Sequence, residues 1–191
     1  MAITLSGDSP NLTSASLTTP TLTSPTFAGT PAGVGVLTSM TAQASTSGTS
    51  IDFTSIPSWV KRVTVMFDSV STNGTAQPLF QLGAGSVTTS GYVATSSRLQ
   101  DPNAVAVLSS TAGFILNGAN ASNAISGAIQ ISNVTGNVWV AQGVFSATSV
   151  ATMSLTSSGV ISLSGTLDRV RITTSNGTDT FDAGSINILY E

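Results

Sequence analysis

Two carboxylates near the C-terminus come closest to a catalytic or metal-binding pattern. Asp179 and Asp182 flank Phe181 shortly after the dipeptide Asn176-Gly177. A calcium ion needs roughly six to eight oxygen ligands, and the sequence contains no Asp-x-Asn-x-Asp-Gly loop. A glycosidase pair needs carboxylates that face each other across a cleft, and two acids so close in one loop do not provide this. We therefore expect a hydrogen-bonded turn here, with no metal site and no catalytic residue.

The amino acids that most often carry catalysis are missing from the chain. It contains no Cys and no His, which excludes disulfides, the usual zinc sites, and Cys–His or Ser–His nucleophile pairs. Its 8 acidic residues are well spaced along 191 residues, whereas a polysaccharide depolymerase usually carries paired acids in a long groove. We expect no cofactor and no enzymatic activity.

Three aromatic residues are candidates for contacting a carbohydrate or receptor. Trp59 and Trp139 could form a stacking platform, but both lie within apolar stretches, which favours a place in the core of two strands. Tyr92 follows Gly91 in a turn context. It is the better candidate for an exposed ring that contacts a host receptor.

Charged residues are scarce and scattered. They make up 7% of the chain, against about 25% in typical soluble proteins, so we expect a surface rich in hydroxyl groups. The basic residues do not form the stripe that follows a phosphate backbone, and we expect no nucleic-acid binding; they are Lys61, Arg62, Arg98, Arg169 and Arg171. The adjacent Lys61 and Arg62 could bind a sulfate or carboxylate, but pairing with nearby Asp is the favoured interpretation.

No apolar run reaches the roughly 18 residues that a membrane span requires, so we expect no membrane insertion.

From about residue 50 the sequence consists of short β-like runs separated by turn residues. Residues Val60–Phe67 alternate apolar and polar side chains, as do Asp168–Thr174, and no window has a sustained helical period. The expected strands are Ser50–Thr54, Val60–Phe67, Leu79–Leu82, Ser86–Ala94, Ala104–Leu108, Gly113–Leu116, Ala124–Ser132, Asn137–Ser146, Val150–Leu155, Val160–Leu163, Asp168–Thr174 and Ser185–Tyr190. Turns are expected at Asn73-Gly74, Asn117-Gly118, Gly136-Asn137, Ser158-Gly159 and Asn176-Gly177. The pattern predicts an all-β fold in which residues 50–191 form an antiparallel, jelly-roll-like β-sandwich.

The N-terminal region has a five-residue repeat instead. Large apolar residues recur at Leu12, Leu17, Leu22 and Phe27, and prolines recur at the same step at Pro20 and Pro25. Proline prevents a continuous helix, and side chains five apart point to opposite faces of a flat strand. We expect residues 1–31 to be an extended arm, with these six residues as anchor or assembly contacts. Residues 32–49 would be a connector or first strand. A generic low-complexity linker is the alternative.

Three stretches of the C-terminal region carry a resemblance to a known family. They are residues 50–62 (SIDFTSIPSWVKR), 91–96 (GYVATS) and 179–191 (DTFDAGSINILYE). Together they resemble a domain that recurs at the C-termini of tailed-bacteriophage fibre and virion-accessory proteins. The Thr/Pro repeats are similar to the anchoring arms of such proteins. The resemblance implies a trimeric component of the virion.

These observations lead to one functional hypothesis and two alternatives. The leading hypothesis is a virion structural accessory protein, either a head fibre or a capsid decoration protein, which forms a homotrimer on the virion surface. Its partners would be its own copies and a capsid or tail protein, with the capsid slightly favoured because the chain is short. The alternatives are a tail fibre that binds the host receptor and a glycan-binding adhesin or lectin whose partner is a cell-surface glycan.

Overall fold

A computed structural model describes residues 37–101, 104–148 and 152–191 of the chain. These residues form fourteen β-strands and no helix, so the predicted all-β class is confirmed. The predicted arm at residues 1–31, with all six candidate anchor residues, lies outside the described residues. Two short strands, β1 (Thr38–Ser39) and β2 (Gln43–Ala44), lie in the segment expected to be a connector or first strand.

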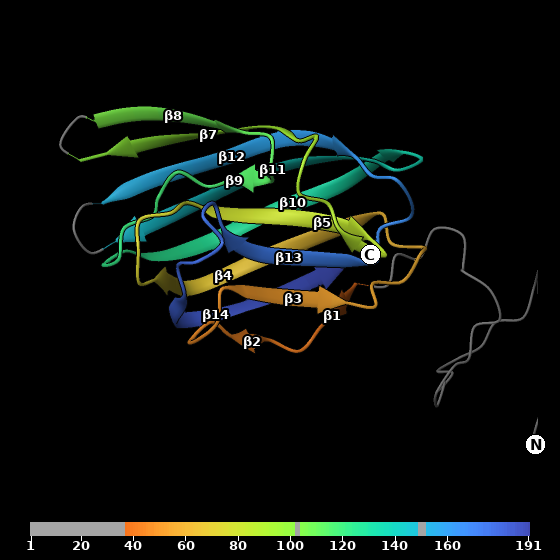
Figure 1. The fold of residues 1–191 in the computed structure, drawn as a ribbon, viewed down its shortest axis with the longest axis horizontal. Coiled ribbons are helices and arrows are strands. Elements are labelled where there is room, and N and C mark those ends of the chain that lie inside the picture. Colours follow the sequence, from red (N-terminus) through yellow and green to blue (C-terminus); the bar gives the residue numbers. More distant parts are fainter. Residues whose placement is uncertain (1–36, 102–103, 149–151) are drawn as a thin grey trace, which may run out of the picture. The chain divides into compact units, whose positions relative to one another are not determined.

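The strands form two antiparallel sheets, which confirms the predicted sandwich (Figure 1). The larger sheet has nine strands, in the order β1-β14-β4-β10-β11-β12-β7-β8 with β2 also beside β14. Besides β1 and β2 these are β4 (Arg62–Thr72), β7 (Val93–Gln100), β8 (Ala104–Ser110), β10 (Ala124–Thr135), β11 (Val138–Thr148), β12 (Met153–Ser162) and β14 (Phe181–Tyr190).

The smaller sheet has five strands, in the order β3-β13-β5-β6 with β9 also beside β5. They are β3 (Ser50–Thr54), β5 (Pro78–Ala84), β6 (Ser86–Val87), β9 (Phe114–Ile115) and β13 (Arg169–Thr174). Figure 1 shows β3, β13 and β5 in front of β14, β4 and β10, while β7 and β8 form the far end of the larger sheet.

The connectivity is that of a jelly roll with an extension. Four antiparallel pairs are nested in the chain, namely β2 with β14, β3 with β13, β4 with β10 and β5 with β9. Successive pairs lie in alternate sheets, which is the arrangement of a long hairpin folded over on itself. The remaining strands β11, β12, β7 and β8 continue the larger sheet beyond β10.

The core lies between the sheets and follows the predicted alternation. Val63, Val65 and Phe67 of β4 are buried, while the residues between them face outward. The ring of Phe67 packs 5.2 Å from that of Phe80 in the opposite sheet and 5.6 Å from that of Phe145, measured between centroids. The Phe67–Phe80 contact joins the inner faces of the two sheets, while Phe145 belongs to the same sheet as Phe67.

Several predicted strand bounds are wrong; for example, β4 extends to Thr72 and β14 begins at Phe181. The expected turn at Ser158-Gly159 lies inside the continuous strand β12, which pairs with β11 on one side and β7 on the other. Glycine is needed there for close packing, because a Cβ at position 159 would lie 3.0 Å from the Cβ of Ala94. The expected strand Ser86–Ala94 is interrupted, since β6 ends at Val87 and β7 begins at Val93.

Candidate binding face

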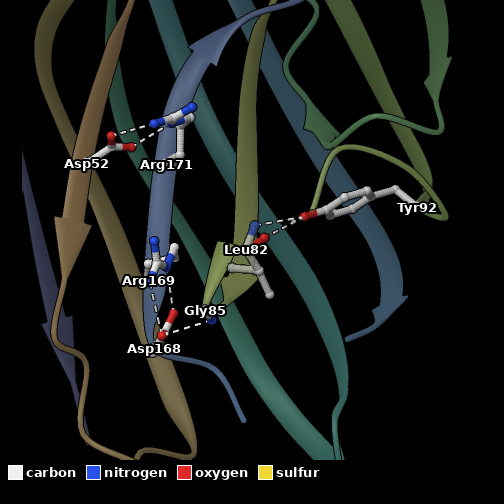
Figure 2. A network of polar contacts seen from close by, with 7 residues as sticks. All are labelled: Asp52, Leu82, Gly85, Tyr92, Asp168, Arg169 and Arg171. Atoms are coloured by element: carbon white, nitrogen blue, oxygen red, sulfur yellow. Dashed lines mark hydrogen bonds and ion pairs between the residues drawn. The ribbon is translucent and has the colours of Figure 1, made fainter. Parts of the chain in front are cut away.

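Tyr92 is not the exposed aromatic that its turn context suggested, and that prediction is wrong. Its exposed fraction is 1%, and its ring packs edge-on against Phe114 with centroids 5.1 Å apart. Its hydroxyl oxygen accepts a hydrogen bond of 2.7 Å from the backbone N–H of Leu82 (Figure 2). Burial raises the pKa of Tyr92 to about 12, and the bond from Leu82 partly opposes this shift. Tyr92 is therefore a core residue, and its ring is not exposed for contact with a receptor.

The outer face of the smaller sheet carries two Arg–Asp pairs (Figure 2). Arg171 on β13 binds the carboxylate of Asp52 on β3 through two hydrogen bonds of 2.7 Å. Arg169 binds Asp168, which also accepts a hydrogen bond of 2.9 Å from the backbone N–H of Gly85. The guanidinium of Arg169 lowers the pKa of Asp168. All four charged groups are thus paired within the sheet, which favours a structural role.

The acidic pair near the C-terminus forms the expected hydrogen-bonded turn. Asp179 accepts hydrogen bonds from the side chain of Asn176, at 2.7 Å, and from the backbone N–H of Ala76, at 2.9 Å. These donors lower the pKa of Asp179. Asp182 instead accepts a hydrogen bond from the hydroxyl of Ser71. The two carboxylates bind separate partners, and the described residues contain no cluster of acidic side chains that could hold a metal ion.

The two tryptophans do not form a common platform. Trp139 is buried in β11, as predicted. Trp59 lies outside any strand with an exposed fraction of 43%, so its predicted place in a strand core is wrong. Its ring packs at a tilt against Tyr190, with centroids 5.8 Å apart. Trp59 is therefore a single exposed aromatic residue next to the end of β14.

The basic dipeptide has partners other than the expected aspartates. Arg62 forms an ion pair with Glu191, and their backbones are joined by hydrogen bonds of 2.9 and 3.0 Å. Lys61 donates a 3.4 Å hydrogen bond to the side-chain oxygen of Asn133. The prediction that these residues pair with Asp is wrong because the end of β14 lies beside the start of β4.

Five neighbouring strands of the larger sheet, β10, β11, β12, β7 and β8, form an outer face without charge. Strands β8, β10, β11 and β12 contain no charged residue. In β7 the only one is Arg98, which pairs in register with the buried Leu155 and so lies on the inner side. The outward positions of these five strands carry mainly valine, serine, threonine and glutamine, together with alanine and the exposed Leu99. The alternation within residues 138–148 and 153–162 indicates uncharged outward positions in two of these strands, but it does not indicate that all five strands lie side by side.

The middle of this face is an open depression of about 580 Å³. Across it the register places Gln130 opposite Gln142, Gln142 opposite Ser158, and Ser158 opposite Thr95. The exposed side chain of Gln142 makes no hydrogen bond with the described residues, which leaves its amide free to donate and accept. The depression is lined by, among others, Thr64, Gln130, Gln142, Val144, Thr156 and Ser158. The hydroxyl groups of Ser158 and Thr156 are hydrogen-bonded to those of Thr95 and Ser97, at 3.3 and 2.6 Å. The free amide of Gln142 and these uncharged groups fit a neutral polar ligand or a protein surface.

Comparisons with known proteins add no further information about this face. No family model, no curated protein and no solved structure matches the chain. Among the described residues there is no helix long and apolar enough to cross a membrane.

Proposed function

We propose that this protein is a structural accessory protein of a bacteriophage virion. In this proposal it is a homotrimeric short fibre or decoration protein on the particle surface, with the capsid as the favoured site. Residues 1–31 fasten it to the particle, and the β-sandwich projects outward, where it can assist adsorption to the host.

The observation that carries the proposal is the contrast between the two parts of the chain. The five-residue repeat contains regularly spaced apolar residues that a single flat strand cannot bury on one face. Ordering an extended residue costs about 1–2 kcal/mol, and burying a large apolar side chain returns only about 1.5–3 kcal/mol. Four such side chains in about thirty residues do not offset that cost alone. An arm of this kind becomes ordered when other chains supply backbone pairing and shared burial.

The folded part is consistent with a structural role. Most of its carboxylates are bound by Arg, Asn, Ser or backbone donors. The outer face formed by β10, β11, β12, β7 and β8 is uncharged and rich in hydroxyl groups. Three stretches of this part also resemble the C-terminal domains of phage fibre and accessory proteins.

Deletion of residues 1–31 tests the anchor role. We expect the truncated protein to keep the β-rich circular dichroism spectrum of the full chain but to be missing from purified particles. In a second variant, Leu12, Leu17, Leu22 and Phe27 are changed to Ser, so that the arm keeps its length but loses its large apolar side chains. We expect this variant also to fail to attach. Normal incorporation of both variants would contradict the proposal.

Mass measurement of the purified full-length protein tests the trimer. We expect a mass that corresponds to three chains or a multiple of three. A stable monomer at every concentration would refute this part of the proposal while leaving the virion role to be judged by the deletion experiment.

The open depression favours a second candidate function, which is binding of a neutral host-surface glycan. The free amide of Gln142 beside the hydroxyl of Ser158 can exchange hydrogen bonds with sugar hydroxyl groups. If this function is correct, a glycan array should show saccharide binding that is lost in Gln142→Ala. The control Thr135→Ala removes an exposed polar side chain of the same sheet, on β10, outside the depression. A blank array would exclude this candidate for the glycans tested.

A further inference from the structure

Strand β8 is the last strand of the larger sheet and has an open edge. Its seven residues pair with β7 from Ala104↔Gln100 to Ser110↔Ala94. No strand among the described residues pairs with its other side. The backbone N–H and C=O groups on that side are therefore available to another chain.

The other edges of the two sheets are protected in ways that β8 is not. At the opposite end of the larger sheet, β1 and β2 contain two residues each, and β6 at one edge of the smaller sheet is equally short. The remaining edge strand, β3, carries Asp52 in its ion pair with Arg171. Short strands and charges are the usual means by which proteins prevent pairing between edges. Strand β8 is long and has no charge, no proline and no register shift.

The side chains of β8 are unusually apolar for an exposed edge. Val105 and Val107 on the outer side have exposed fractions of 70% and 66%. Leu108 on the inner side is also exposed, so β8 exposes apolar side chains on both of its faces. An edge of this composition favours pairing with a strand of another chain.

A second copy of β8 fits this edge better than the N-terminal repeat does. Pro20 and Pro25 are five residues apart, so in a strand one of them would face the hydrogen-bonding side, where proline has no donor. Two β8 strands have equal length and no charge to repel each other. An antiparallel register centred on Val107 pairs all seven residues. It also uses both open edges at once, so assembly stops at two copies.

We propose that two copies of the chain associate through antiparallel β8–β8 pairing, which joins their larger sheets into one continuous sheet. This contact is independent of the proposed trimer, because a two-fold contact cannot close a ring of three. If the trimer exists, the contact joins two trimers into an assembly of six chains. If it does not, the contact produces a dimer.

The test is the native mass of the full-length protein and of Val107→Lys, measured over a series of concentrations. A lysine at the centre of the edge places two like charges opposite each other, and we expect the mass to fall by half, from six chains to three or from two to one. Val134→Lys is the control, because Val134 is an exposed valine at the far end of β10. We expect that variant to keep the parent mass. An unchanged mass for Val107→Lys, or a parent that contains one or three chains at every concentration, would overturn the proposal.

Disulfide trapping provides a second test that does not depend on how well the lysine variant folds. Because the chain contains no cysteine, Val107→Cys introduces a single thiol, and directly opposed residues of an antiparallel pair lie close to disulfide range. We expect rapid formation of a covalent dimer under mild oxidation, and none in Val134→Cys. Equal cross-linking of the two variants would contradict β8–β8 pairing.

Discussion

Replacing Tyr92 by Phe should destabilise the folded domain by removing one buried hydrogen bond. Along β5, pairing with β9 covers Leu79 and Phe80, and pairing with β6 covers Gly83 and Ala84. The Tyr92 hydroxyl accepts from the backbone N–H of Leu82 in the gap between these two segments. Leu82 is buried, so in the variant its N–H has no acceptor, which costs about 1–3 kcal/mol. At about 2 kcal/mol the Tm should fall by about 4–8 °C.

The pH dependence of this effect gives a sharper test. Burial raises the pKa of Tyr92 from 10.0 to about 12, so above pH 10 the unfolded chain loses this proton before the folded chain does. The stabilising contribution is therefore complete below pH 10 and is lost as the pH rises toward 12. The loss approaches about 1.4 kcal/mol per pH unit within this window. Phenylalanine does not titrate, so the advantage of the native protein over Tyr92→Phe should shrink across the same range.

Urea unfolding followed by circular dichroism at pH 7, 10, 11 and 12 would measure both effects. Tyr190→Phe is the matched control, because Tyr190 is only partly buried against Trp59 and its hydroxyl makes no hydrogen bond with the described residues. We expect the control to match the native protein at pH 7. Equal unfolding free energies for the two variants at pH 7, or a constant difference between native protein and Tyr92→Phe from pH 10 to 12, would refute the role given to this hydroxyl.

Two further substitutions test the packing and the C-terminal turn. Gly143→Ala should destabilise the domain by about 1–3 kcal/mol in urea unfolding, because its Cβ would lie 2.8 Å from the Cβ of the buried Ile129. The control Gly165→Ala should be nearly neutral, because its Cβ would meet only Ala84 at 3.4 Å. Equal losses of stability in the two variants would contradict this packing account. Asp179→Asn should weaken the acid dependence of stability, because hydrogen bonds from Asn176 and Ala76 lower the pKa of Asp179. Its contribution is present above the unfolded pKa of about 3.9 and is lost as the pH falls through the lowered folded value. Parallel acid-unfolding curves for native protein and variant would count against this assignment.

Alternation of apolar and polar residues was sufficient to predict much of the sandwich. In β4 the buried positions Val63, Val65 and Phe67 are those that the pattern indicated, and β3 has the predicted bounds. The pattern is misleading where one residue type serves two structural purposes. Glycine at position 159 indicated a turn, but it lies inside β12 because the neighbouring strand leaves no room for a Cβ.

The surface properties were harder to predict because they depend on pairing between distant strands. The turn context of Tyr92 suggested exposure, yet Gly91 takes a φ of 84° and the ring is buried against Phe114. The uncharged outer face requires β10, β11, β12, β7 and β8 to lie side by side, an order that the sequence does not indicate. The open edge of β8 likewise follows only from the strand order, since residues 104–110 by themselves look like any other strand.

The proposal that the chain is a component of a phage virion is tested most directly by cryo-electron microscopy of the intact particles in which the proposal places it. The proposal predicts density on the particle surface into which the two-sheet domain fits, in three copies around an axis, with residues 1–31 in contact with a capsid protein. Particles whose fully resolved capsid and tail contain no density for this domain would contradict the account.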